Sequence, residues 1–225
     1  MKKLLVALAA FVVLGLSSSA KADTLTFTPT PVDLNDLDHH SVYTWRTDNV
    51  NLNGKTITGA RISISNIANW DANTNRLFIH LLDTAKASGV SSFLDDPNTN
   101  NTSVTIDDDF VDPRYHNQSN WLVANGTADT FLTSQSFTTT PTNFVYNFTA
   151  AQITALMSYI SNDGRFALGF DPDCHFFNDG IKFEIYTSSP ATVPEPATMA
   201  LLGTGLAGLY ARRRRQQKAR RSAVA

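Results

Sequence analysis

The stretch TGARISISNI, residues 58–67, decides the fold of this chain. Apolar side chains stand at Ala60, Ile62 and Ile64, and polar residues fill positions 61, 63 and 65 between them. An alternation of period two puts the apolar row on one face of a β-strand and the polar row on the other. The stretch therefore predicts a strand in a sheet with one buried face.

Short runs of similar character recur along the chain, separated by Asn, Asp, Gly and Pro. They cover residues 25–28, 41–45, 55–57, 77–82, 104–106, 121–123, 131–137, 143–148, 165–170 and 181–186. The run LFIHLL, residues 77–82, is apolar on both faces and predicts a fully buried strand. Asn53-Gly54, just before residues 55–57, predicts a hairpin-type turn. Many short, regularly spaced strands predict a mainly β body of the β-sandwich or jelly-roll type.

One helix interrupts this pattern. Thr149 and Gln152 have the spacing of a capping box, and apolar residues then recur at helical spacing through residues 153–160. Gly164 supplies a natural stop. We expect this helix to cap an open end of the sandwich.

The charge of the body excludes some partners. Residues 23–190 carry eight basic and 19 acidic side chains, a net charge of −11. Such a body does not suit nucleic acid, because phosphate contacts need cations, and it leaves room for Ca²⁺. The single cysteine, Cys174, cannot form an intramolecular disulfide. A buried, inert thiol is the simpler interpretation, and pairing between molecules is the alternative.

The N-terminal residues predict export. Lys2 and Lys3 precede an apolar run at residues 4–16, and Ala20-Lys21-Ala22 has the small-residue form of a cleavage site. These are the parts of a signal peptide, so we expect signal peptidase to remove residues 1–22. The predicted mature body is a single β-sandwich domain of residues 23–187.

The C-terminal stretch VPEPATMALLGTGLAGLYARRRRQQKARR, residues 193–221, contains a glycine pattern shared with dinucleotide-binding loops. Such a loop needs a preceding buried strand and an acidic residue about 20 positions later. Here the glycines follow Pro-Glu-Pro, and no acidic residue occurs after Glu195. The better interpretation is an apolar helix at residues 197–210 that ends at a basic cluster.

That helix is short for a membrane span, which takes about 20 apolar residues. Arginine side chains can extend its reach by placing their charges at the interface. We expect the basic cluster to stay on the cytoplasmic side, near anionic lipid headgroups. A basic nucleic-acid tail is the alternative, but it does not account for the apolar helix directly before the charges.

The order of these parts resembles the PEP-CTERM sorting signal of bacterial exosortase substrates. The motif residues are Val193, Pro194, Glu195 and Pro196, and the stop cluster is Arg212, Arg213, Arg214 and Arg215. The resemblance implies an exported protein held in the cytoplasmic membrane by a single C-terminal hydrophobic helix and its lipid contacts, then processed by an exosortase. It also implies a final place in the bacterial cell envelope or extracellular matrix, linked with extracellular polysaccharide. The corresponding segments are a linker at 188–192, the sorting signal at 193–215 and a basic cytoplasmic tail at 216–225.

Two acidic loops are candidate calcium sites. The first offers Asp171, Asp173, Asn178 and Asp179, and the second offers Asp96, Asn98, Asn100 and Asp107. Their oxygen ligands suit Ca²⁺, but Asp and Asn also close ordinary loops by bonding their own backbone. We favour ordinary loops closed by their own side chains, and we assign no cofactor to them. Calcium binding is the alternative. A third acidic patch, equally open, is formed by Asp33, Asp36 and Asp38 before His39 and His40.

Two aromatic residues with polar neighbours are the candidate glycan contacts. Trp70 stands between Asn69 and Asp71 in a loop-like context, and Tyr115 lies among charged residues. Aromatic faces can carry sugar rings while Asn and Asp bind hydroxyls, although burial in the core is the competing interpretation. The chain lacks a nucleophile elbow or a zinc-protease motif, so we assign no catalytic residue. The leading hypothesis is a non-enzymatic structural or adhesive envelope protein; the alternatives are a carbohydrate-binding module and a small glycan hydrolase.

Overall fold

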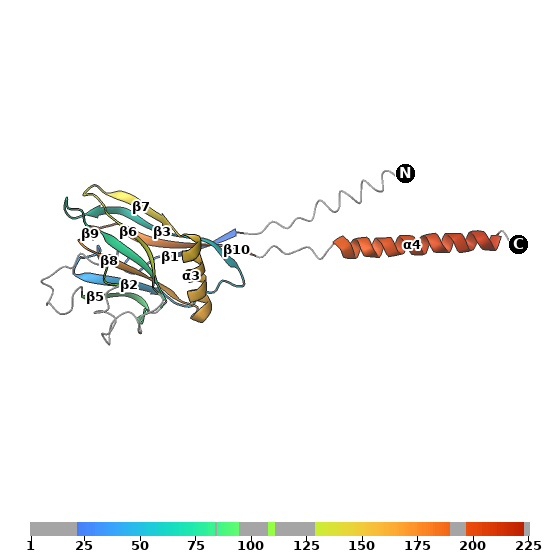
Figure 1. The fold of residues 1–225 in the computed structure, drawn as a ribbon, viewed down its shortest axis with the longest axis horizontal. Coiled ribbons are helices and arrows are strands. Elements are labelled where there is room, and N and C mark those ends of the chain that lie inside the picture. Colours follow the sequence, from blue (N-terminus) through green and yellow to red (C-terminus); the bar gives the residue numbers. More distant parts are fainter. Residues whose placement is uncertain (1–21, 84, 95–107, 111–128, 190–196, 223–225) are drawn as a thin grey trace. The chain divides into compact units, whose positions relative to one another are not determined.

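The computed structural model describes residues 22–83, 85–94, 108–110, 129–189 and 197–222 (Figure 1). The residues fall into two compact units, which are described separately: the body, Ala22–Ser188, and a second unit that includes Ser189–Ala225. Residues 1–21 of the expected signal peptide and the strands expected at 104–106 and 121–123 lie outside the described residues, while Ala22 is the first residue of β1.

Two antiparallel sheets build the body. The first has the order β1 (Ala22–Phe27), β10 (Gly180–Ser188), β3 (Thr56–Asn69) and β7 (Thr142–Asn147), with the short β9 (Phe176–Phe177) paired to β3. The second has the order β5 (Gly89–Leu94), β2 (Ser41–Thr47), β8 (Phe166–Pro172), β4 (Leu77–Leu82) and β6 (Asp129–Gln135).

The path of the chain between the sheets is that of a jelly roll. The chain changes sheet at each step from β1 to β4, remains in the second sheet through β6, and alternates again through β7, β8 and β10. Eight strands thus form two facing sheets, while β5 and β9 are additions. The predicted mainly β, jelly-roll-like body is confirmed.

The core lies between the sheets and explains the alternation in residues 58–67. Ala60, Ile62 and Ile64 are at most 3% exposed, and Ile62 lies opposite Phe183 of β10. Facing them from the second sheet are buried residues such as Leu168 of β8. Because side chains alternate along a strand, this inward row fixes the register of β3 against β10.

The outer face of the second sheet is also covered, at β4 and β8. His80 of β4 is 1% exposed; its ring lies 4.7 Å from that of Phe110, and its Nε2 is 2.9 Å from Asp108 Oδ2. On β8, Asp171 Oδ2 accepts a 2.7 Å hydrogen bond from the Asp109 N–H. Residues 108–110 thus shield the side of β4 that faces away from the core. Both faces of β4 are therefore largely buried, and this explains why residues 77–82 are apolar without alternation.

The predicted capping helix is present as α3 (Ala150–Asp163), which crosses the end of the sandwich in Figure 1. The Thr149 hydroxyl accepts from the Gln152 N–H at 3.3 Å, and the Gln152 side chain accepts from the Thr149 N–H at 2.9 Å. Gly164, with φ of 76°, ends the helix. Leu156 and Ile160 are buried in the core.

Some local predictions were wrong. Asn53 and Gly54 do form a turn, with φ of 51° and 74°, but residues 48–52 before it are not a strand, so it is no hairpin. Strand β5 was missed because its sequence, GVSSFL, carries little alternation. Strand β9 was missed because two residues are too few for a periodic signal.

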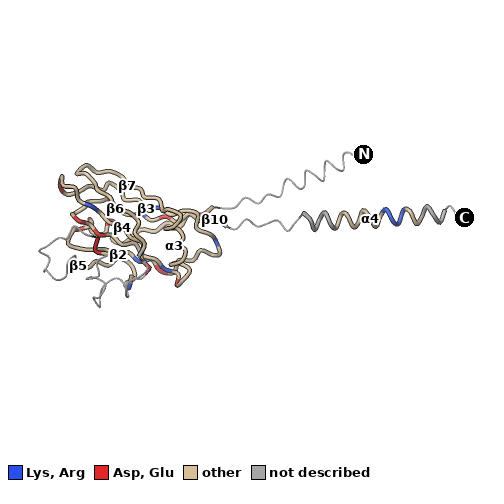
Figure 2. Tube along the Cα trace, in the orientation of Figure 1, with Lys and Arg blue, Asp and Glu red and all other residues tan. Residues whose placement is uncertain are grey.

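The C-terminal helix is longer than expected. Helix α4 runs from Ala197 to Ser222, so residues 212–215 continue it rather than end it (Figure 2). Arg, Lys, Gln and Ala are all good helix formers, and no Gly or Pro follows Gly208. In the described part of the chain, no helix combines the length and the apolar character needed to cross a membrane.

Candidate functional site

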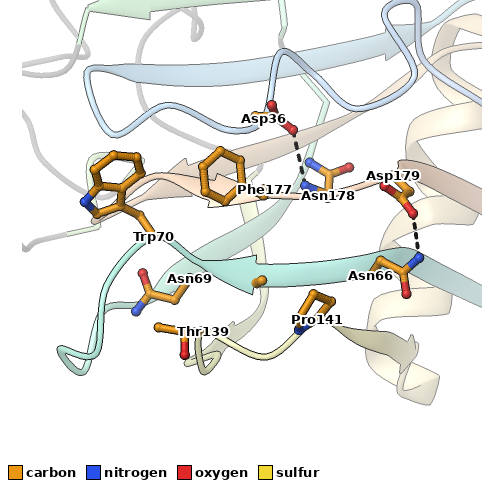
Figure 3. Close-up of a pocket in the computed structure, with 10 residues that line it drawn as sticks. Asp36, Asn66, Asn69, Trp70, Thr139, Pro141, Phe177, Asn178 and Asp179 are labelled. Atoms are coloured by element: carbon orange, nitrogen blue, oxygen red, sulfur yellow. Dashed lines mark hydrogen bonds between the residues drawn. The ribbon is translucent and has the colours of Figure 1, made fainter.

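A pocket of about 710 Å³ opens at one edge of the first sheet, where β3 ends (Figure 3). Four chain segments contribute to it: the loop at residue 36, residues 66–70 at the end of β3, the loop at residues 139–141, and residues 177–179, which begin in β9. The lining residues are Asp36, Asn66, Ala68, Asn69, Trp70, Thr139, Pro141, Phe177, Asn178 and Asp179. Three residues predicted for two different roles therefore line the same cavity: Trp70 as a glycan contact, and Asn178 and Asp179 as calcium ligands.

The pairing of β3 with β9 builds one wall of the pocket. Ala68 lies opposite Phe177, and Asn69 lies opposite Phe176. Because neighbouring strand residues point to opposite faces, Phe176 enters the core and is fully buried, while Phe177 is turned outward and is 42% exposed. The sequence Phe176-Phe177 thus supplies both an anchor and a surface ring.

Asn66 is aimed at the pocket by an irregularity in β3. The register between β3 and β7 shifts between Ile64 and Ile67, and Asn66 has a positive φ of 49°. Such a bulge redirects a side chain that regular pairing would place elsewhere. The Asn66 Nδ2 donates to Asp179 Oδ2 at 2.5 Å, and its backbone N–H donates to Asn143 Oδ1 at 3.0 Å.

Trp70 and Phe177 form an exposed aromatic platform at the mouth of the pocket. Trp70 is 65% exposed, and the two ring centroids are 6.0 Å apart with 43° between the planes. The backbone N–H of Trp70 donates to the His175 carbonyl at 2.9 Å, which ties the loop that carries the indole to the residue just before β9. Large aromatic side chains are normally well buried, as Trp45 is in this core. Two neighbouring exposed rings over a polar cavity are typical of a binding surface.

Asp36 reaches the pocket from an unusual turn. Leu34, Asn35, Asp36 and Leu37 all have φ between 45° and 60°. Left-handed backbone costs roughly 1–2 kcal/mol for each residue that has a Cβ, and here the complete burial of Leu34 and Leu37 offsets that cost. The turn presents Asp36, whose Oδ1 accepts from the Asn178 N–H at 3.2 Å. Strained backbone of this kind is concentrated at functional sites.

The polar groups of the pocket are acceptors and amides. Two carboxylates, three amide side chains and one hydroxyl line it, and no Lys or Arg is among the described lining residues. Such a surface repels phosphate and carboxylate ligands and suits hydroxyl donors. A flat apolar platform beside clustered hydroxyl-binding groups can hold a neutral sugar ring by stacking and hydrogen bonding.

Cys174 precedes the platform and is half-buried. Burial is the main cause that raises the pKa of its thiol, and the negative charges of Asp71 and Asp173 raise this pKa further. A backbone hydrogen bond at His175 lowers the pKa, but by less than burial raises it. The thiol therefore stays protonated at neutral pH and is a poor nucleophile.

The four residues of the first predicted calcium loop have separate environments. Asp171 binds the backbone of residue 109, Asp173 Oδ2 accepts from the Arg76 N–H at 3.2 Å, and Asp179 binds Asn66. Asn178 Oδ1 accepts from the Gly180 N–H at 3.0 Å, and its Nδ2 donates to the Asp33 carbonyl at 2.9 Å. Among the described residues, these carboxylates belong to no group of three His, Cys, Asp or Glu side chains whose ligand atoms lie within 4.8 Å of one another. Calcium binding there stays a prediction.

Other predicted site residues lie outside the described part of the chain. They are Asp96, Asn98, Asn100, Asp107 and Tyr115, together with the motif residues Val193, Pro194, Glu195 and Pro196. Arg212, Arg213, Arg214 and Arg215 lie in α4 and are exposed there.

Sequence reasoning assigned no role to Phe177 or Asn66, and it placed Asp36 only in an acidic patch. Phe177 had a usable signal, since one of two adjacent phenylalanines in a strand must face away from the core. Asn66 had a signal that was not used, because a polar residue stands there in the apolar row and Ile67 continues the pattern one position out of phase. Asp36 belonged to a patch that sequence alone could not connect to Trp70.

Comparison with known proteins identifies one segment. Residues 192–215 match the PEP-CTERM protein-sorting motif, as the order of their parts predicts. The motif marks the chain as an exported protein that is processed by an exosortase. No curated protein matches this sequence.

Proposed function

We propose that the body is a non-enzymatic, adhesive component of the bacterial envelope that binds neutral extracellular polysaccharide through the pocket at Trp70 and Phe177. The observation that carries the proposal is the aromatic platform, with Trp70 65% exposed beside an exposed Phe177 at the mouth of a polar cavity. A sugar ring stacked on the indole leaves its edge hydroxyls facing the amides and carboxylates of the wall.

The acidic lining decides the class of polysaccharide. Asp36 and Asp179 lie in the wall, without a cation among the described lining residues. A uronic-acid polymer would bring like charge to the site, which costs energy even in partly exposed surroundings. We therefore assign the pocket to neutral hexose polymers.

We also propose a route by which the body reaches the cell surface. Signal peptidase removes the N-terminal signal peptide, and the apolar part of α4 with its Arg cluster holds the precursor at the lipid of the cytoplasmic membrane until the exosortase acts. Support comes from the matched sorting motif and from the basic run that directly follows the apolar residues. The body then reaches the outer envelope or extracellular matrix.

Replacing the platform should remove glycan binding. We expect Trp70→Ala to weaken binding of residues 22–188 to the producer's neutral polysaccharide by about 10–100-fold, because loss of one stacking aromatic costs roughly 1–3 kcal/mol. Affinity electrophoresis or co-sedimentation measures the change, and the polymer should stay uncut.

Phe93→Ala is the matched control, since Phe93 is an aromatic residue of β5 on the covered face of the other sheet. It should leave glycan affinity unchanged. Equal affinity of Trp70→Ala and the unmodified protein would refute the pocket as the binding site, and chain-length reduction of the polymer would refute the non-enzymatic role.

Processing can be tested by intact mass. We expect the mature protein from producing cells to end within residues 193–196, so that the exposed arginines of α4 are absent, because the exosortase acts at the motif. Substituting alanine for Pro194, Glu195 and Pro196 together should leave the heavier precursor. A surface-exposed mature form that retains residues 212–221 would contradict this outcome.

A further inference from the structure

A second constellation lies outside the pocket, in the turn that leads into β2. Asp38 Oδ1 is 3.0 Å from His40 Nδ1 and 3.4 Å from His39 Nδ1. The two imidazole rings are 3.8 Å apart between centroids, with 39° between their planes. All three ligand atoms lie within 4.8 Å of one another, and among the described residues this is the group of His, Cys, Asp and Glu side chains with that property.

The separations match those around a tetrahedral metal ion. Zinc binds imidazole nitrogen and carboxylate oxygen at about 2.0–2.2 Å, which places neighbouring ligand atoms of a tetrahedron about 3.3–3.6 Å apart. The 3.4 Å separation falls within that range, and the 3.0 Å separation, which is a hydrogen bond between His40 and Asp38, lies just below it. Small side-chain rotations would therefore bring the three groups onto one ion.

The backbone holds this arrangement in place. The Asp38 N–H donates to Tyr43 Oη at 2.9 Å, and the Ser41 N–H donates to the Asp38 carbonyl at 3.0 Å. The His40 N–H donates to Asp38 Oδ1 at 3.1 Å. Tyr43 is a core residue, 3% exposed, so the turn is fastened to the sandwich. Ligands that are positioned before binding lose less entropy when the ion arrives.

The ligand set selects the cation. Two imidazoles with one carboxylate suit Zn²⁺, Cu²⁺ or Ni²⁺, whereas Ca²⁺ and Mg²⁺ prefer oxygen ligands throughout. The side chains of His39, His40 and Asp38 remain 30%, 36% and 45% exposed, which leaves room for water or another ligand on the solvent side. We propose that Asp38, His39 and His40 bind a divalent transition-metal ion, with Zn²⁺ as its representative, at a site separate from the glycan pocket.

Zinc titration of the body tests the site. We expect residues 22–188, prepared without a polyhistidine tag, to bind one Zn²⁺ per chain by isothermal titration calorimetry, while Ca²⁺ leaves the imidazole resonances of His39 and His40 unchanged. The ¹H–¹⁵N imidazole resonances of His39 and His40 should shift on zinc addition and return with EDTA. Loss of even an outer partner of a metal ligand weakens affinity by about 10–100-fold, so His39→Gln, His40→Gln and Asp38→Asn should each weaken zinc binding by at least about ten-fold.

Asp33→Asn is the matched control, because Asp33 lies in the same loop but outside the cluster. It should bind zinc like the unmodified body. Circular dichroism confirms that each variant is folded, and the imidazole spectra report binding even where stability changes. Absence of zinc binding, or zinc affinity that survives all three ligand substitutions, overturns the site.

Discussion

Phe183→Ala should lower the free energy of unfolding of the body by about 3–5 kcal/mol, the usual cost of removing a fully buried phenylalanine. Phe183 is 0% exposed, and its ring centroid lies 5.1 Å from that of Phe166 and 5.4 Å from that of Phe148. The substitution leaves a cavity where β10 faces β8, at the centre of the sandwich. Urea denaturation followed by fluorescence measures the change, and we expect the melting temperature to fall by about 6–20 °C.

Phe177→Ala is the matched control for that experiment. Phe177 is 42% exposed, so its removal should change stability by less than about 1 kcal/mol. In the glycan-binding assay, Phe177→Ala should weaken binding because Phe177 belongs to the platform. Folded Phe183→Ala should retain binding because Phe183 is buried in the core. A stability loss for Phe183→Ala no larger than that for Phe177→Ala would contradict the placement of β10 in the core.

Gly169→Ala should destabilise the body by about 1–3 kcal/mol, the range for forcing an extra group into a packed site. A Cβ at this position would lie 2.5 Å from Cζ and 2.8 Å from Cε1 of Phe110. Phe110 is 2% exposed and packs with Val42 and Leu82, so it has little room to move. The glycine is needed for the close approach of that ring and not for its own backbone conformation.

A double-mutant cycle isolates this contact. Phe110→Ala removes the ring and its burial, and Gly169→Ala in that background should then cost much less than it does alone. Thermal unfolding of the four proteins gives the coupling energy. Strict additivity would show that residues 108–110 do not cover β8.

The sorting signal and the cap of α3 were open to sequence reasoning because each depends on neighbours in the chain. Thr149 and Gln152 are three residues apart, and their reciprocal hydrogen bonds need no other element. The motif, the apolar helix and the arginines likewise follow one another directly. The length of α4 was missed because charge was taken as a stop, whereas a helix ends where propensity or capping ends it.

The glycan pocket was open to sequence reasoning only in part. Trp70 stood out by its polar neighbours, and Asp179 by its acidic loop, but no local pattern joined them. Asp36 and Phe177 are brought together through backbone pairing and a left-handed turn, across more than a hundred residues. Contacts of that range depend on strand order, which the sequence did not reveal.

By itself, the sequence determined the β class of the body, the strands whose apolar residues alternate, the capped helix and the address for export and processing. Each of these features depends on residues that lie only a few positions apart in the chain. The hydrogen bonds and the burial patterns that produce them can therefore be inferred from the local sequence. Only the tertiary structure decided which strands are neighbours, which partner Asn66 meets where β3 is irregular, and which aromatic residues stay exposed. Strand order and aromatic exposure depend on how the two sheets pack against each other. Whether a given side chain is buried is decided by residues that are distant in the chain, because they determine the space available to it.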